Sequence, residues 1–234
     1  MSLPSVEQSH KERPRSSKAR SVAKKLLLAF YLFVIIFAAW NWATLASLSQ
    51  PQFHAIMVAI GKQPATPDYQ ADQNRFVFPR LAIDAPFTES PSSSPLNFQD
   101  WDSIRTALTK GVSLNYSTST LDGAKLAYVT GHSSDTYPHP YSSVFASLGQ
   151  AKVGDQFVIT GHGEIRTYKV VSSQVVNPRN VLAFSEANLA GGSSTQRVAV
   201  VTCWPLLTNL NRLVVLGERV TDDTKLSYTG GTNL

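Results

Sequence analysis

The chain has 234 residues, a length that suits one folded domain of about 100 to 200 residues with accessory segments. Its formal net charge is +5 at pH 7, and residues 1–25 account for the whole surplus with seven Lys or Arg against two Glu. The rest of the chain carries fourteen basic and fourteen acidic residues. This balance offers no basic surface to attract phosphates and excludes nucleic acid as an expected partner.

An uncharged, apolar run occupies residues 26–48, directly after the basic segment. It reaches the roughly 20 residues that a helix needs to cross a bilayer. A cleaved signal peptide is the alternative, although its apolar core is usually only about 7 to 15 residues long. Basic residues favour the cytoplasmic side, and Trp40 and Trp42 suit the outer interface. We therefore expect a cell-membrane protein with a cytoplasmic tail over residues 1–25, one transmembrane helix over residues 26–48 and an extracellular remainder.

The segments that follow the apolar run are mostly polar. Residues 49–79 include Pro64, Pro67 and a polar stretch, and are expected to form an extracellular linker. Residues 80–87 alternate like a strand, and the Pro/Ser-rich residues 88–97 are expected to form an exposed loop. Residues 98–111 place apolar side chains at helical spacing before a glycine, which predicts a helix.

Beyond this helix the chain is a succession of short strand patterns separated by turn residues. The patterns cover residues 124–130, 155–160, 165–176, 196–203 and 212–220. They predict a mainly antiparallel barrel or sandwich. The polar residues 222–234 are expected to fray.

The single cysteine, Cys203, and a repeated Thr-Gly-His triplet are the candidate catalytic features. An unpaired thiol outside the cell is either buried filler or a reactive group. The first triplet ends at His132, where an apolar strand opens into a polar loop, a common place for active-site residues. A histidine merely hydrogen-bonded at a strand end is the alternative. The second triplet ends at His162 in a four-residue hairpin connection, where a histidine is usually solvated.

Cys203 ends an apolar strand pattern, and Arg212 begins the next one. Antiparallel pairing of these strands would bring the guanidinium back beside the thiol. A thiolate can attack a carbonyl, an imidazole can exchange protons and a guanidinium can stabilise the developing oxyanion. Cys203, His132 and Arg212 are therefore the expected catalytic residues for acyl transfer without a metal.

The motifs around these residues resemble those of the sortases, the membrane-anchored cysteine transpeptidases of mainly Gram-positive bacteria. The family's Thr-Leu-x-Thr-Cys signature stands here as AVVTC at residues 199–203. Residues 202–215 fit Thr-Cys-x-Pro-x-x-x-Asn-x-x-Arg-Leu-x-Val, a form typical of the pilin-polymerising and related branches. TGHSS at residues 130–134 is similar to the family's Gly-His-Ser, and residues 80–87 are similar to its first barrel strand.

The resemblance covers residues 80–220 and implies a mainly β fold. This fold is an eight-stranded sortase-type β-barrel with a few short helices, placed at residues 80–221 after one transmembrane helix. It also favours His132 over His162 as the catalytic histidine. Thr202 and Asn209 are candidate substrate-binding residues, although Thr202 can simply pack in its strand and Asn209 can shape its loop.

The implied activity is that of a cysteine transpeptidase and endopeptidase of the hydrolase class. Its thiol would cleave an LPxTG-like C-terminal sorting signal of a surface protein or pilin between Thr and Gly. An amine from a cell-wall precursor or a pilin lysine would resolve the thioacyl enzyme. The alternative is a catalytically inactive, membrane-anchored barrel that binds peptide or envelope polymer.

Three further expectations concern the surroundings of the site. No cofactor is expected. No metal is expected either, because one cysteine and dispersed histidines lack ligand spacing. Asp135 follows His132 by three residues and is either a third member of a triad or a solvated loop aspartate.

Overall fold

The computed structural model describes residues 17–59, 69–91, 101–116, 118, 121–135, 137, 139–189 and 195–220. The predicted fraying segment at residues 222–234 and most of the Pro/Ser-rich loop lie outside the described residues. The chain forms two compact units, Met1–Trp42 and Ala43–Leu234.

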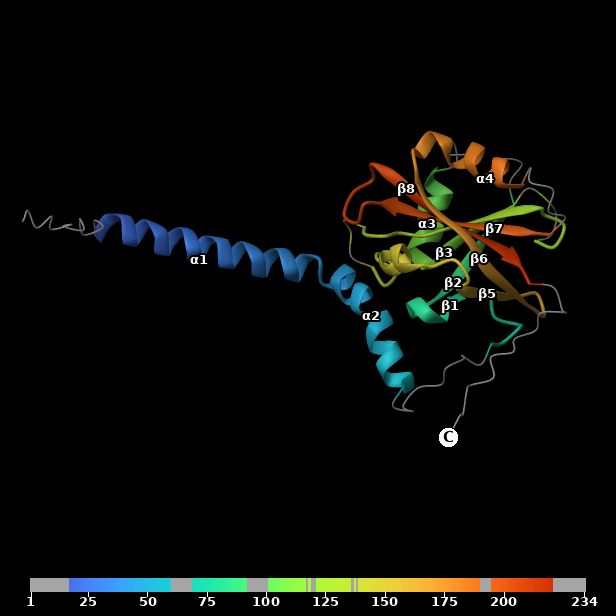
Figure 1. The fold of residues 1–234 in the computed structure, drawn as a ribbon, viewed down its shortest axis with the longest axis horizontal. Helices are drawn as coiled ribbons and strands as arrows, with labels where there is room; N and C mark the ends of the chain where they lie inside the picture. Colours follow the sequence, from blue (N-terminus) through green and yellow to red (C-terminus); the bar gives the residue numbers. More distant parts are fainter. Residues whose placement is uncertain are drawn as a thin grey trace, which may run out of the picture. The chain divides into compact units, whose positions relative to one another are not determined.

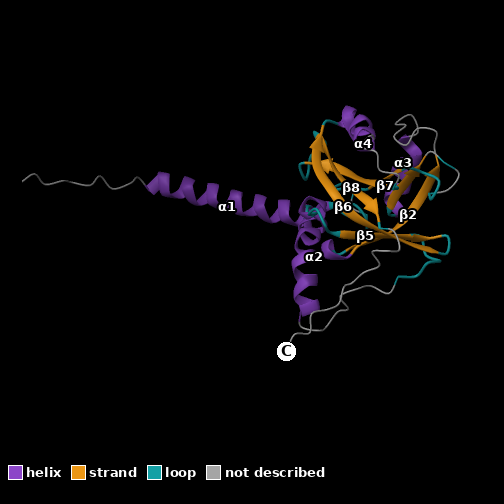
Figure 2. Ribbon diagram, turned by 45° about the vertical axis from the view of Figure 1, so that its right-hand side comes forward, coloured by secondary structure: helices purple, strands orange, loops and turns teal. Residues whose placement is uncertain are grey.

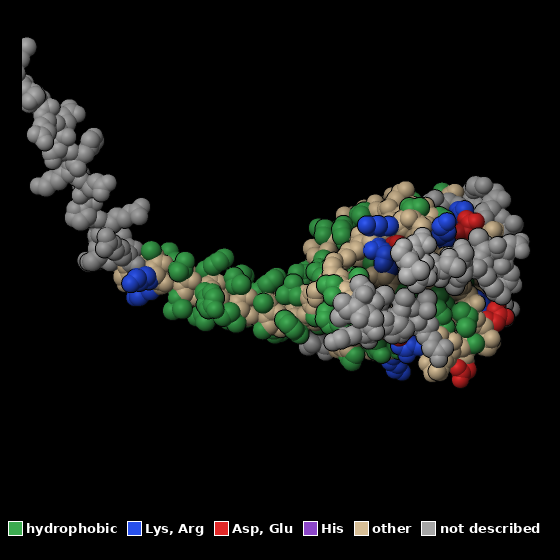
Figure 3. All heavy atoms as spheres, turned by 60° about the horizontal axis from the view of Figure 1, so that its bottom comes forward, with side chains coloured by type: hydrophobic (Ala, Val, Ile, Leu, Met, Phe, Trp, Pro, Cys, Tyr) green, Lys and Arg blue, Asp and Glu red, His purple; other side chains and the backbone are tan. Residues whose placement is uncertain are grey.

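The first unit contains helix α1 (Ser17–Trp40). Its segment Ser21–Trp40 is long and apolar enough to cross a membrane, a property that a signal sequence shares. Hydrophobic side chains cover the visible face of this helix, with basic residues toward its N-terminal end (Figure 3). The expected span of residues 26–48 is not one continuous helix. The chain turns at Asn41, whose side-chain amide donates to the Phe37 carbonyl at 2.9 Å.

Helix α2 (Trp42–Ala59) occupies part of the segment that we expected to be a linker. Its residues from Ala43 onward belong to the second unit, where two contacts join the helix to the loop before β5. Thr44 Oγ1 and Ser143 Oγ share a buried 2.7 Å hydrogen bond, and the Gln150 amide donates to the Leu48 carbonyl at 3.2 Å. Residues 49–59 of the expected linker are therefore helical, and the role of residues 49–79 as a linker stays a prediction.

Eight strands close into a barrel in the order β1-β2-β3-β4-β7-β8-β6-β5 (Figures 1 and 2). Two pairs, β2–β3 and β4–β7, are parallel, and the other pairs are antiparallel. This arrangement confirms the predicted eight-stranded barrel with few helices. The strands are β1 (Arg75–Phe78), β2 (Ile83–Pro91), β3 (Val112–Tyr116), β4 (Leu126–Thr130), β5 (Gln156–Gly161), β6 (Glu164–Val176), β7 (Arg197–Trp204) and β8 (Asn211–Arg219).

Two of these strands were not predicted, and one boundary was misplaced. β1 has only four residues, RFVF, and no alternation, whereas β3, VSLNY, alternates apolar and polar residues and was overlooked. The barrel therefore begins at residue 75 rather than 80, and residues 80–87 belong mainly to the second strand. The predicted helix at residues 98–111 corresponds to α3 (Trp101–Lys110).

The core fills the barrel and extends beneath one outer helix. Inside, the rings of Phe157 and Tyr168 stack with centroids 5.2 Å apart. Outside, α4 (Val181–Leu189) contributes Val181 to a second cluster that includes residues of β4, β7 and β8. β7 is therefore covered on both faces, which explains why residues 198–202 are all buried and why their sequence is a continuous apolar run.

Candidate active site

Cys203 and Arg212 lie directly opposite each other on the antiparallel pair β7–β8. Side chains of directly opposed residues point to the same face of a sheet, so the thiol and the guanidinium share one face, as expected from the sequence. The thiol is half-buried. The Arg212 Nη1 donates to the carbonyl oxygens of Asn209 at 3.1 Å and Asn211 at 3.0 Å, which orients the guanidinium at the start of β8.

His132 reaches the same end of the barrel from the other side of β7. β4 and β7 are parallel, and their register pairs Thr130 with Val201. His132 and Cys203 each lie two residues further along their strands, so the two residues leave the barrel at the same edge. Cys203 is consequently flanked by His132 on one neighbouring strand and by Arg212 on the other.

Gly131 fixes the approach to His132. Its N–H donates to the Val201 carbonyl at 3.3 Å, and its carbonyl accepts a 2.8 Å hydrogen bond from the Thr202 hydroxyl. A Cβ at this position would lie 2.6 Å from the Phe145 ring, so only glycine lets the chain pass this ring. Gly131 and Thr202, the residues next to the imidazole and the thiol, are thus hydrogen-bonded to each other.

The two sequence candidates for substrate binding occupy different environments. Thr202 is only 2% exposed and uses its hydroxyl to hold Gly131. Asn209 lies exposed in the β7–β8 connection, where its carbonyl accepts from Arg212. Their contact with substrate stays a prediction. Trp204 packs beside Gly149, where a Cβ would come within 2.6 Å of the indole, so this residue helps to hold the loop before β5.

His162 lies at the opposite end of the barrel from His132. β5 runs antiparallel to β6, β6 to β8, and β8 to β7, so the end of β5 is remote from the ends of β4 and β7. His162 sits at the tip of the predicted β5–β6 hairpin and is 61% exposed. Its Nε2 contacts Glu89 Oε1 at 2.7 Å. The imidazole therefore belongs to a surface pair, far from Cys203.

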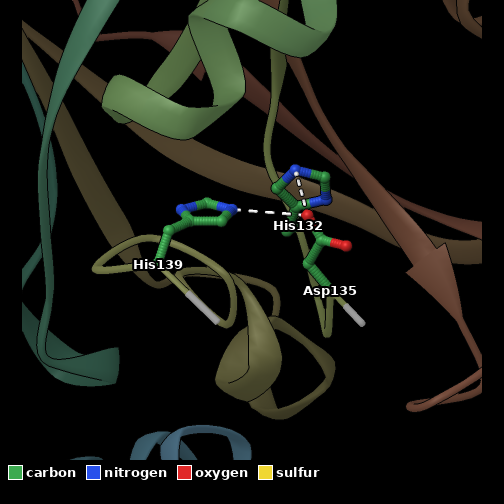
Figure 4. A group of neighbouring side chains, drawn as sticks. All are labelled: His132, Asp135 and His139. Carbon is green, nitrogen blue, oxygen red and sulfur yellow. Dashed lines mark ion pairs between the residues drawn. The ribbon is translucent and has the colours of Figure 1, made fainter. Parts of the chain in front are cut away.

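Asp135 lies between His132 and a second imidazole, that of His139 (Figure 4). Its Oδ2 is 3.5 Å from Nε2 of His132 and 3.4 Å from Nε2 of His139. The two rings meet edge to face with centroids 5.4 Å apart. His139 was missed from the sequence, although the spacing of His132, Asp135 and His139 within one polar loop was a usable signal.

Burial lowers the pKa of His132 below its ordinary value, and three titratable groups modify this effect. Asp135 raises the pKa of His132, whereas His139 and Arg105 of α3 lower it. Because burial dominates, the imidazole is held mainly neutral at pH 7 and can accept a proton.

The three side chains also place their donor atoms within 4.8 Å of one another, a spacing that metal sites share. His132 and His139 are therefore not dispersed in space, contrary to the reason given above for expecting no metal. The Nδ1 of His139, however, accepts from the Tyr141 N–H at 3.3 Å, so the neutral ring carries its proton on Nε2. A metal-binding histidine instead donates through its second nitrogen. The His139 ring is therefore better suited to contact with the Asp135 carboxylate than to coordination of a metal ion. The absence of a metal stays a prediction.

Comparison with known proteins places this geometry in a family. A Sortase domain model matches residues 77–220, more than half of the chain. Sortase C-1 from Actinomyces oris is 26% identical, with a TM-score of 0.48 over 74% of this chain and 83% of that one. Sortase C1 from Streptococcus suis is 22% identical, with a TM-score of 0.48 over 72% and 78%.

Clostridium perfringens sortase C, solved with the C-terminal cell wall sorting motif, is 21% identical, with a TM-score of 0.47 over 76% of this chain and 88% of that one. No match is found among curated proteins. The family match covers the barrel and all three candidate catalytic residues. The chain therefore belongs to the sortase family.

Proposed function

We propose that this sortase cleaves an LPxTG-like sorting signal between Thr and Gly through Cys203 and transfers the acyl group to an amine. The observation that carries the proposal is the position of Cys203 on β7 between Arg212 of β8 and the end of β4, which leads into His132 two residues later. The family consists of cysteine transpeptidases, and this arrangement supplies a nucleophile, a proton carrier and an oxyanion donor.

In the first half of the proposed reaction, the neutral imidazole of His132 accepts the thiol proton and Cys203 attacks the Thr carbonyl carbon. Arg212 donates hydrogen bonds to the oxyanion of the tetrahedral intermediate. The C–N bond then breaks as the His132 imidazolium protonates the departing Gly amine. The product of this half is a thioester on Cys203 and a free C-terminal peptide.

In the second half, an amine attacks the thioester carbonyl. His132 takes the proton that the amine loses and returns a proton to the departing thiolate of Cys203. The amide formed joins the surface protein or pilin to the amine donor, which is a cell-wall precursor or a pilin lysine. Water in place of the amine would give hydrolysis by the same steps.

Mass spectrometry of a peptide that contains the sorting signal tests the chemistry directly. Wild-type protein is expected to gain the mass of the acyl fragment on Cys203 and, with an added amine, to release the acylated amine. The Cys203→Ala variant should form no adduct, because the thioester requires the sulfur. An adduct in the alanine variant contradicts the mechanism, and wild-type protein that binds peptide without any turnover supports the inactive-barrel alternative.

Helix α1 is proposed to anchor the enzyme with its basic end in the cytoplasm and the barrel outside the cell. The helix has the length and composition required, and the seven basic residues of residues 1–25 lie on the side predicted to stay inside.

Protease added to intact cells is therefore expected to digest the barrel and to spare the N-terminal tail. Epitope tags at the two ends of the chain would report the two fragments separately. A cytoplasmic protein serves as the control for cell integrity. If the barrel survives while the extracellular loops of other membrane proteins in the same cells are cut, the proposed orientation is wrong.

A further inference from the structure

The loop after β4 arranges one carboxylate against two imidazoles. The Oδ2 of Asp135 faces Nε2 of His132 at 3.5 Å and Nε2 of His139 at 3.4 Å. Both distances exceed an ordinary N–H···O hydrogen bond of about 2.7 to 3.2 Å, so the contacts are mainly electrostatic in this state. All three side chains are largely enclosed, with exposures of 22%, 25% and 14% for His132, Asp135 and His139. A solvated loop aspartate would be more open than this.

The backbone of the loop fixes the carboxylate from behind. The Tyr137 N–H donates to Asp135 Oδ1 at 3.3 Å, and the Asp135 N–H donates to the Ser142 carbonyl at 2.8 Å. The Phe145 N–H donates to the His132 carbonyl at 2.8 Å, which closes the loop over both residues. With Oδ1 held by the backbone, Oδ2 is directed at the two rings.

His139 completes the arrangement as the second neighbour of Oδ2. Because its Nδ1 accepts from the Tyr141 N–H, its Nε2 carries the proton and lies 3.4 Å from the carboxylate, close enough for electrostatic attraction. The ring also shields one side of the carboxylate from solvent. His139 therefore helps to fix the position of the Asp135 carboxylate.

We propose that Asp135, held by His139, is a positioning residue that orients the catalytic imidazole of His132. In this role the proton of the neutral His132 ring lies on Nε2, the nitrogen nearer the carboxylate, and Nδ1 keeps the lone pair that accepts the Cys203 proton. When the imidazolium forms, the carboxylate stabilises it without taking the proton, as the aspartate does in serine-protease triads. The positioning role depends on the proposed catalytic function of His132. The contact between the His132 ring and the Asp135 carboxylate does not depend on that function.

Electrostatics supplies a readout that simple damage to the loop would not reproduce. The charged groups that act on the His132 ring are Asp135 and His139 from its own loop and Arg105 from α3, and burial is the largest influence on its pKa. Replacing Asp135 with Asn removes the group that raises the pKa of His132. Replacing His139 with Gln removes a group that lowers this pKa and keeps an N–H donor for the carboxylate. The two variants should therefore move the pKa of His132 in opposite directions.

The first experiment is an NMR titration of the His132 ring in the full chain in detergent micelles, with Cys203→Ala as the background and His132→Gln to assign the signal. Asp135→Asn should lower the pKa of His132, and His139→Gln should raise it. Glu89→Gln is the matched control, because it removes a carboxylate from His162 at the opposite end of the barrel. An unmoved pKa in Asp135→Asn, or shifts of the same sign in both loop variants, would overturn the pairing. This measurement needs no turnover, so it stands apart from the proposed function.

The second experiment measures peptide cleavage with an intact thiol. Asp135→Asn should lower kcat by about tenfold to a thousandfold, less than the roughly 10⁴-fold effect of a buried triad aspartate, because the carboxylate here is more distant and partly exposed. KM should change little, since the carboxylate acts on the imidazole rather than on substrate. Glu89→Gln should cleave at nearly the wild-type rate. Wild-type kcat in a folded Asp135→Asn protein, beside an active wild type, would overturn the positioning role.

Discussion

His132→Asn is expected to slow peptide cleavage by about 10²- to 10⁴-fold, the usual contribution of a general acid–base group. Without the imidazole, the thiol proton and the leaving amine have no partner on the β4 side of Cys203. Folding should be little affected, because the side chain lies in a loop at the barrel rim and outside the hydrophobic core, and asparagine is polar and smaller than histidine. Steady-state kinetics and a thermal melt of each variant are the measurements.

His162→Asn provides the matched control for this comparison. Asparagine tolerates the left-handed backbone of His162, where φ is 55°. The substitution removes an exposed contact with Glu89, and exposed ion pairs contribute only about 0 to 1 kcal/mol. Cleavage should stay within a few fold of the wild type. Equal losses in the two variants, both folded, would contradict the assignment of His132.

Arg212→Ala is expected to reduce turnover by about 10²- to 10³-fold, the typical cost of losing one oxyanion donor. The free energy of unfolding should change little, because the hydrogen bonds of the guanidinium within the described part of the chain go to backbone carbonyls at and just before the start of β8. Arg212→Lys should recover only part of the rate, because one ammonium cannot reproduce the planar fork of donors. Kinetics with the same peptide, together with denaturant unfolding, separates the two effects.

Arg219 lies at the other end of the same strand and tests the strand register. Its Nη1 contacts Asp122 Oδ1 at 2.5 Å, and its partner in the sheet is Tyr168. Arg219→Ala should disturb this ion pair and leave turnover nearly unchanged. Wild-type turnover in Arg212→Ala, or an equal loss in a folded Arg219→Ala, would refute the oxyanion role.

The sequence alone allowed prediction of β7 and β8, the strands that carry Cys203 and Arg212, because these strands are consecutive in the chain. β7 is apolar on both faces, and the short return to β8 leaves antiparallel pairing as the simplest path, so Arg212 could be placed opposite Cys203. The hairpin around His162 could be predicted for the same reason, because its two strands are consecutive in the chain. The pairing of β4 with β7 could not be predicted from local sequence, because these parallel strands lie far apart in the chain. His132 comes beside Cys203 through the closure of the barrel.

Other features were hidden because they depend on tertiary contacts rather than on a period in the sequence. β1 has only four residues and no alternation to identify it, whereas β3 does alternate and its short pattern was overlooked. Helix α2 follows an apolar run and includes Pro51, so it resembled the end of a membrane span and the start of a linker. The contact of Asp135 with His139 depends on the conformation of a polar loop, which backbone hydrogen bonds to Ser142 and Tyr137 determine.

A soluble fragment for biochemical work should begin well before residue 80, where the sequence resemblance to the family begins. Starting at residue 80 would remove β1, which pairs with both β2 and β5, and would open the barrel into a sheet with two free edges. It would also leave Ser143 without the hydroxyl of Thr44. A fragment that starts at Ala43, where the second compact unit begins, keeps both the closing strand and the helix that packs on the barrel. The smallest piece expected to fold is thus longer than the piece that performs the chemistry.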